Sequence, residues 1–81
     1  MAEKKVRVYS TPVCPWCHRA KDFLREHGIK FEDIDVSRDR KAGMEMVEKS
    51  GQMGVPVIEI DGEIVVGFDR ERIAALLDVK E

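Results

Sequence analysis

The stretch Cys14-Pro15-Trp16-Cys17 contains both cysteines of this 81-residue chain and stands between a strand-like run and a helix-like run. Residues i and i+3 at a helix start have Cα atoms about 5–6 Å apart, which a disulfide can bridge. Such a bridge closes a loop of about four residues, and chain entropy gives it only about 2 kcal/mol of stabilisation. The pair therefore suits reversible opening and closing better than it suits a structural cross-link.

Composition and charge limit the classes of function. The 43% apolar and 37% charged residues are typical of a soluble globular protein, and the length suits one domain over residues 1–81, with a core over about 5–77. A net charge of −2 gives no general attraction to nucleic acid or to an anionic membrane. We find neither a membrane-spanning apolar stretch nor a signal-peptide pattern. We therefore expect a cytoplasmic monomer, in which a disulfide is more often catalytic or redox-sensing than structural.

The pattern of apolar residues, turns and caps predicts the element order β-α-β-α-β-β-α. The strands are expected at residues 6–9, 31–36, 57–60 and 63–66. The helices are expected after the Cys pair, after Ser37 and after Asp69, with Gly28 ending the first helix and Asp61-Gly62 forming a hairpin turn. A parallel crossover followed by an antiparallel hairpin makes an α/β fold, a four-stranded mixed sheet packed by three helices.

Two side-chain assignments follow from this order. Lys21, one turn beyond Cys17, could support a thiolate, but we expect an ordinary solvated lysine on the wet face of the first helix. The methionines at positions 44, 46 and 53 are expected to fill space around the second helix and its following loop.

Three segments, in this order and on these elements, resemble the glutaredoxin family of the thioredoxin fold. Residues 13–21 resemble the family's active-site segment, in which an aromatic residue follows Cys-Pro. Residues 54–56 fall where the family carries Thr-Val-Pro with a cis proline, and residues 66–69 fall where it carries Gly-Gly-X-Asp. The resemblance implies a dithiol thiol-disulfide oxidoreductase, an electron carrier in cell redox homeostasis that reduces disulfides of proteins or small molecules.

The resemblance leaves two reductants open, since the Pro-Trp between the cysteines is glutaredoxin-like while other positions differ from that family's pattern. The family holds no bound cofactor and uses glutathione or thioredoxin reductase as the electron source. Thr11, Gly54 and Val66 stand where many glutathione-using members carry Lys, Thr and Gly. Together with Gly67-Phe68, these residues make the chain similar to redoxins of the NrdH type, which are reduced by thioredoxin reductase. Glutathione is then a possible co-substrate.

The two cysteines are expected to have different roles. A thiolate, not a thiol, attacks a disulfide. Cys14 faces the unpaired N–H groups of a helix N-terminus, which favour its anion. Cys17 lies one turn deeper and should keep its proton until a mixed disulfide forms. Cys14 is therefore the attacking residue and Cys17 the resolving one.

A substrate surface is expected around the cysteines. Trp16, the only tryptophan, lies at a wet tip and suits partner docking. A cis bond before Pro56 would leave the Val55 backbone free to pair with an extended substrate. The helix start at Asp69 could take a carboxylate such as that of glutathione. The expected substrate-binding residues are Pro15, Trp16, Val55, Pro56, Gly67, Phe68 and Asp69.

Other functions remain open. Cys14, Cys17, His18 and His27 could be counted as metal ligands, but the second closely spaced ligand pair of a structural zinc site is missing, and we expect no metal. Cys14 to His18 also matches the C-x-x-C-H pattern of haem attachment. A metal or iron–sulfur carrier, a pair of inert buried thiols and a non-catalytic thioredoxin-fold interaction module are the alternatives.

Overall fold

The computed structural model describes residues 5–51 and 54–79. Its elements are β1 (Val6–Ser10), α1 (Pro15–Glu26), β2 (Glu32–Asp35), α2 (Arg40–Ser50), β3 (Val57–Ile60), β4 (Glu63–Val66) and α3 (Arg70–Leu77). The predicted order is confirmed, and the four strands form one sheet in the order β2-β1-β3-β4. β1 runs parallel to β2 and antiparallel to β3, and β3 runs antiparallel to β4.

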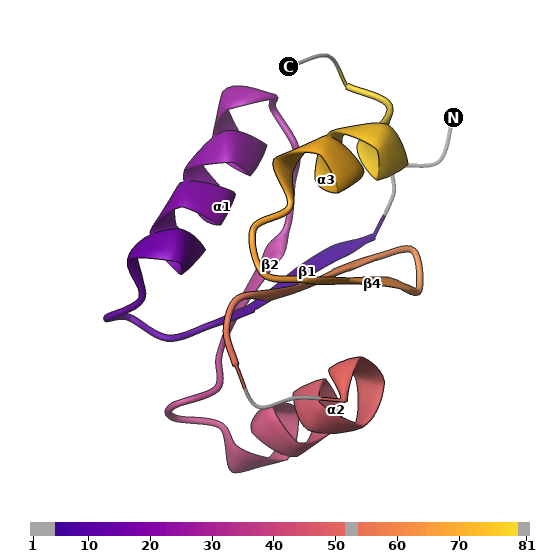
Figure 1. The fold of residues 1–81 in the computed structure, drawn as a ribbon. Helices are drawn as coiled ribbons and strands as arrows, with labels where there is room; N and C mark the ends of the chain where they lie inside the picture. Colours follow the sequence, from indigo (N-terminus) through magenta and orange to yellow (C-terminus); the bar gives the residue numbers. More distant parts are fainter. Residues whose placement is uncertain (1–4, 52–53, 80–81) are drawn as a thin grey trace.

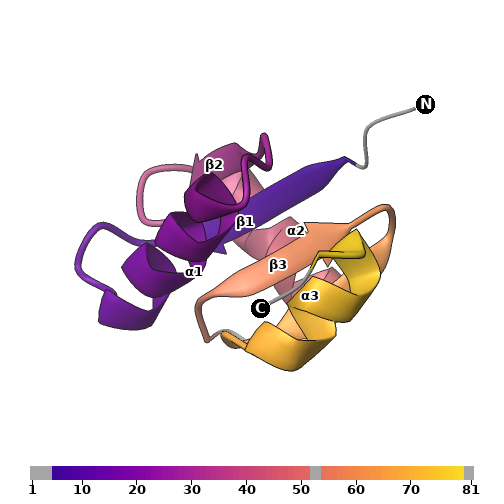
Figure 2. The same cartoon turned by 90° about the horizontal axis from the view of Figure 1, so that it is seen from above.

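The sheet is covered on both faces. α1 and α3 lie on one face and α2 lies on the other, as Figure 1 shows, and Figure 2 shows α1 and α3 side by side above the strands. Alternation along β1 supplies both cores, because Val8 packs with Leu24 and Ile73 while Tyr9 packs with Met46. None of the helices in the described ranges is long and apolar enough to cross a membrane.

The predicted turns are found at both expected places. Asp61 and Gly62 have φ values of 49° and 89°, the two positive angles of a type I′ hairpin turn. Gly28 follows the end of α1 with a φ of 68°, the left-handed conformation that commonly ends a helix. The two local signals therefore fix the connection from α1 to β2 and the hairpin between β3 and β4.

The start of α2 differs from the prediction. The capping residue is Asp39, whose Oδ1 accepts the N–H of Ala42 at 3.0 Å, and not Ser37. The backbone N–H and the hydroxyl of Ser37 both donate to Asp35 Oδ1, at 2.9 and 2.5 Å. Because this turn occupies the Ser37 side chain, the helix starts later, at Arg40.

The packing of α2 also differs from the prediction. Met46 is buried with Ala42 against the sheet, as expected of a space-filling methionine, but Met44 is 62% exposed and fills no core position. The expectation for Met53 falls outside the described residues. The α2 face of the sheet is therefore packed by fewer side chains than the face under α1 and α3.

Candidate active site

Cys14 caps the N-terminus of α1. Its backbone is extended, with φ −95° and ψ 110°, and its Sγ accepts the N–H of Cys17 at 3.3 Å. Pro15 occupies the first helical position, where its missing N–H costs no hydrogen bond. The Cys14 sulfur thus faces a backbone N–H at the positive end of the helix dipole.

Cys17 lies in a different environment on the same helix. It is fully buried, whereas Cys14 is half-buried, and both are free thiols. Burial, with a smaller contribution from the side-chain hydrogen bond with Cys14, raises the pKa of Cys17 to about 11. The structure therefore provides one partly accessible sulfur and one sheltered, protonated sulfur a helical turn apart.

The segment before β3 approaches the cysteines. The Val55-Pro56 peptide is cis, as expected, and the Cys14 thiol donates to the Val55 carbonyl oxygen at 3.9 Å. The Pro56 carbonyl accepts the N–H of Gly67 at 2.8 Å, which attaches the turn before α3 to the same segment. Gly67 has a φ of 78°, where a side chain would be strained. The structure thus brings together three segments that are far apart in the sequence.

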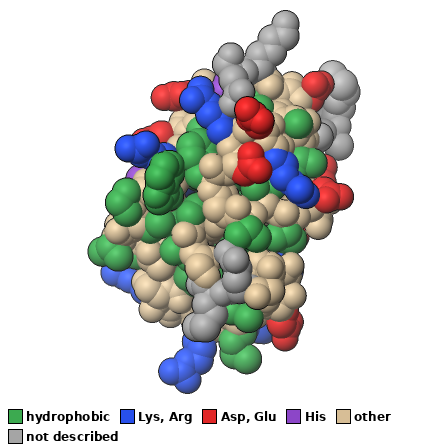
Figure 3. Space-filling view, viewed as in Figure 1, with side chains coloured by type: hydrophobic (Ala, Val, Ile, Leu, Met, Phe, Trp, Pro, Cys, Tyr) green, Lys and Arg blue, Asp and Glu red, His purple; other side chains and the backbone are tan. Residues whose placement is uncertain are grey.

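The exposed rim of the site is apolar. Trp16 is 54% exposed with the Arg19 guanidinium 4.9 Å from its ring centroid, and Val13 is 86% exposed. Figure 3 shows hydrophobic side chains gathered on the side of the molecule where α1 begins. An exposed tryptophan beside a reactive thiol is suited to contact a partner surface.

Phe68 and Asp69 have structural contacts of their own. Phe68 is half-buried, and its ring centroid lies 5.9 Å from that of Phe23 in the core under α1 and α3. Asp69 caps α3, as predicted, by accepting the N–H of Arg72 at 3.2 Å. Phe68 therefore anchors the turn, and the exposed part of this segment is the helix start at Asp69.

Lys21 corrects the expectation from the sequence. It is only 7% exposed, and its Nζ lies 3.2 Å from Asp33 Oδ2, so it is not an ordinary solvated lysine. Helical spacing places it on the buried stripe with Cys17, Ala20 and Leu24, which are also buried. The helical spacing that indicates burial at position 21 was present in the sequence, but the charge of Lys21 led to its assignment to the solvent-exposed face.

The candidate metal ligands do not gather into one cluster among the described residues. Within residues 5–51 and 54–79, no cluster of three or more His, Cys, Asp or Glu side chains could hold a metal ion. His18 is exposed, and its Nε2 lies 2.9 Å from the Pro12 carbonyl oxygen.

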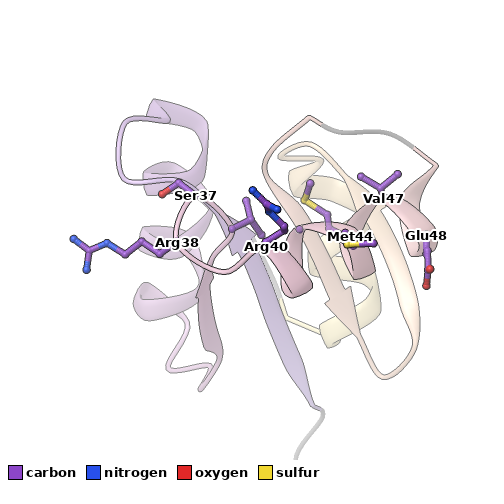
Figure 4. Close-up of a pocket in the computed structure, with 9 residues that line it drawn as sticks. Ser37, Arg38, Arg40, Met44, Val47 and Glu48 are labelled. Carbon is purple, nitrogen blue, oxygen red and sulfur yellow. The ribbon is translucent and has the colours of Figure 1, made fainter.

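A separate hollow lies beside α2. It measures about 690 Å³ and is lined by residues of α2 and of the turn before it, including Ser37, Arg38, Met44 and Val47. Figure 4 shows these side chains around an open surface depression. None of the predicted site residues lines this hollow, so it is separate from the cysteine pair.

Comparisons with known proteins agree with the geometry. The glutaredoxin family model matches residues 6–65. The chain is 47% identical over 73 residues to an uncharacterized glutaredoxin-like 8.6 kDa protein in a rubredoxin operon of Clostridium pasteurianum, covering 90% of this chain and 97% of that one. It is 36% identical over 64 residues to glutaredoxin 3 of Escherichia coli K12, covering 79% and 77%.

A solved structure adds a second subfamily. The NrdH-redoxin of Escherichia coli, described as a glutaredoxin-like protein with a thioredoxin-like activity profile, is 28% identical and superposes with a TM-score of 0.78. The match covers 89% of this chain and 93% of that one. The predicted thioredoxin-like fold is confirmed. The chain therefore belongs to the glutaredoxin family, whose members are thiol-disulfide oxidoreductases.

Proposed function

We propose that this chain is a dithiol oxidoreductase that reduces disulfides of proteins or small molecules through Cys14 and Cys17. The observation that carries the proposal is the contrast between the two sulfurs. Cys14 Sγ accepts a backbone N–H at the start of α1, and Cys17 is fully buried and protonated. We further propose that the chain acts as one cytoplasmic domain over residues 1–81, as a monomer without a bound cofactor.

The proposed reaction has two thiol–disulfide exchanges. The Cys14 thiolate attacks one sulfur of a substrate disulfide, forms a mixed disulfide and releases the other sulfur as a thiol. Cys17 then attacks the Cys14 sulfur and releases the second substrate thiol. The pair ends as a Cys14–Cys17 disulfide, and two electrons have moved to the substrate. A reductant must then return the pair to the dithiol.

The substrate-binding residues are proposed on their positions around Cys14. The Val55 carbonyl lies at hydrogen-bonding distance of the thiol, so an extended substrate would meet this backbone next to the sulfur. Pro15 and Trp16 are exposed at the start of α1. Pro56, Gly67, Phe68 and Asp69 are proposed because the Gly67 N–H donates to the Pro56 carbonyl, which joins their segment to the one that carries Val55. Trp16 is the side chain that we expect to contact a protein partner.

Trapping the intermediate tests the proposal. Cys17→Ser keeps the attacking sulfur but lacks the resolving one, so it should accumulate a covalent complex with a protein disulfide such as insulin on a non-reducing gel. Cys14→Ser is the matched control and should form none. A Cys17→Ser variant that turns over insulin at the wild-type rate would contradict the dithiol mechanism.

Thioredoxin reductase is the proposed main reductant, with glutathione as a weaker co-substrate. Glutathione carries two carboxylates, and Thr11 stands where a lysine would offer one of them a charge-assisted hydrogen bond of about 1.5–3 kcal/mol. The likeness to an NrdH-redoxin supports the same choice. Turnover coupled to thioredoxin reductase should exceed turnover coupled to glutathione and glutathione reductase. Thr11→Lys should raise the latter about tenfold, or about 1.4 kcal/mol; no gain would contradict the argument.

A further inference from the structure

A buried lysine with a partly exposed carboxylate partner lies one helical turn beyond the resolving cysteine. Lys21 Nζ lies 3.2 Å from Asp33 Oδ2 on β2 and 3.5 Å from Ser10 Oγ at the end of β1. The Ser10 hydroxyl donates to Asp33 Oδ1 at 2.9 Å, so three elements meet in one polar cluster. Burying an ammonium group costs free energy that a surface lysine avoids. A lysine at this buried position is therefore expected to have a specific role.

We propose that Lys21 is a positioning residue for the resolving step. Its buried ammonium group stabilises the negative charge that develops on Cys17, and Asp33 and Ser10 hold that ammonium in place. This inference rests on the proposed function, in which Cys17 resolves the mixed disulfide.

The step balances without any further reactant. The Cys17 thiol loses its proton to solvent, its sulfur attacks Cys14 Sγ, and the bond between Cys14 and the substrate sulfur breaks. The substrate sulfur leaves with the electron pair of that bond and takes a proton from solvent. Lys21 remains an ammonium throughout and neither gives nor receives a proton.

The sheltered position of Cys17 creates the need for such a charge. With a pKa of about 11, only about one Cys17 in ten thousand is ionised at pH 7. Side chains at i and i+4 lie on the same face of a helix, so Lys21 lies on the same buried side of α1 as Cys17. Its charge lowers the pKa of Cys17, which favours the thiolate.

The other groups around Cys17 do not supply this charge. Cys14, at the start of α1, acts on Cys17 in the opposite direction and disfavours its ionisation. On the side of β3, residues 55–57 are apolar. Arg19 and Arg25 on α1 are exposed, Arg19 against Trp16 and Arg25 beside Asp22. Within the described residues, the Thr11 backbone lowers the pKa of Cys17 through a hydrogen bond, and Lys21 lowers it further as the one cation whose charge acts on this thiol. Asp33 pairs with that cation.

The first test measures the ionisation of Cys17 directly. In a Cys14→Ser background, the ¹³Cβ shift of Cys17 is followed against pH. Lys21→Met should move the midpoint up by about one pH unit, and Lys21→Arg should restore most of it. Asp33→Asn should move it down, because the charge of Lys21 then lacks its counter-ion. Arg25→Met, which removes an exposed cation from the same helix, is the control and should leave the midpoint unchanged.

The opposite signs separate an electrostatic role from a structural one. Both Lys21→Met and Asp33→Asn break the same ion pair, so a purely structural role would move the midpoint the same way in both. Midpoints that move together, or that do not move relative to Arg25→Met, would overturn the inference. If Lys21→Met fails to fold, Asp33→Asn still decides, because only a downward shift supports the proposal.

The second test measures the resolving step with both cysteines present. Reaction with 5,5′-dithiobis(2-nitrobenzoate) releases one thionitrobenzoate when Cys14 attacks and a second when Cys17 resolves. In Lys21→Met, the fraction of Cys17 that is ionised at pH 7 should fall about tenfold, and each thiolate should be about threefold more nucleophilic. The second release should therefore be about threefold slower. The first release should stay within about twofold, and an unchanged second release would count against Lys21. A second release at the wild-type rate in Cys17→Ser would instead refute the proposed function.

Discussion

The two faces of the sheet each carry a lysine paired with a strand carboxylate, and the two pairs differ in what lies beside them. On the α1 face, Lys21 pairs with Asp33 at 3.2 Å, and the lysine side chain is 9% exposed. On the α2 face, Lys49 pairs with Glu59 at 2.8 Å and lies 3.3 Å from the Tyr9 hydroxyl, with 34% exposure. In the shorter pair the lysine is the more exposed partner, whereas Glu59 at 18% is less exposed than Asp33 at 45%. The neighbour of this pair is a phenol that takes no part in the proposed exchange. We therefore expect an effect on thiol chemistry from the pair that lies near a cysteine, and not from the pair with the shorter N–O distance.

The largest expected effect comes from the apolar cores of the two faces. Leu24→Ala should lower the free energy of unfolding by about 3 kcal/mol, because Leu24 is fully buried in the larger cluster. Met46→Ala should cost about 2 kcal/mol, since Met46 borders the hollow beside α2 and its site can relax. Urea denaturation followed by circular dichroism measures both. Equal costs would show that the α2 face is as tightly packed as the other.

Alkaline pH should destabilise the α1 face through Cys17. The folded state holds the thiol protonated up to a pKa of about 11, while an unfolded thiol ionises near pH 8.5. The protonated Cys17 thiol therefore contributes its full share of the free energy of unfolding below about pH 8.5. About 2–3 kcal/mol of that free energy is lost as the pH rises to 11.

A difference measurement isolates this contribution. The free energy of unfolding of the reduced wild type and of Cys17→Ala is compared by urea titration from pH 8 to pH 11. The titratable groups away from Cys17 are common to both proteins, so their contributions cancel in the difference. Parallel pH profiles would contradict the role assigned to the buried thiol.

Local signals in the sequence predicted most of the fold and the outline of the site. The Cys pair, the Asp61-Gly62 turn and the cap at Asp69 each depend on a few adjacent residues, so their structural assignments are confirmed. The cap of α2 was wrong because Ser37 and Asp39 are both good caps, and only the turn with Asp35 decides between them.

The buried cluster around Lys21 required tertiary information. Its members Ser10, Lys21 and Asp33 come from three elements and have no common motif. The helical stripe from Cys17 to Leu24 indicated burial at position 21, but the partner that makes such burial tolerable lies on β2. A charge on an apolar stripe is therefore a reason to look for a counter-ion on the facing strand.

The two lysine pairs should differ in their effect on stability. Lys21→Met should cost about 1–2 kcal/mol, less than a fully buried pair, because Asp33 is 45% exposed and can be solvated. Lys49→Met should cost about 0.5 kcal/mol, as for other partly exposed pairs. Urea denaturation at pH 7 ranks the two variants. A larger loss of unfolding free energy in Lys49→Met than in Lys21→Met would show that the pair on the α2 face contributes more to stability.

The smallest expected effects concern the caps of the helices on the two faces. Asp39 caps α2 and Asp69 caps α3, each by accepting one backbone N–H, so either change to Ala should cost about 1 kcal/mol of stability. Ser37→Ala is the control on the α2 side and should cost only a few tenths, since Ser37 does not cap the helix. Asp39→Ala should leave glutathione-coupled turnover unchanged, whereas Asp69→Ala should lower it, because α3 begins at the proposed carboxylate site. Equal turnover in the two variants would mean that the start of α3 serves the fold and not the substrate.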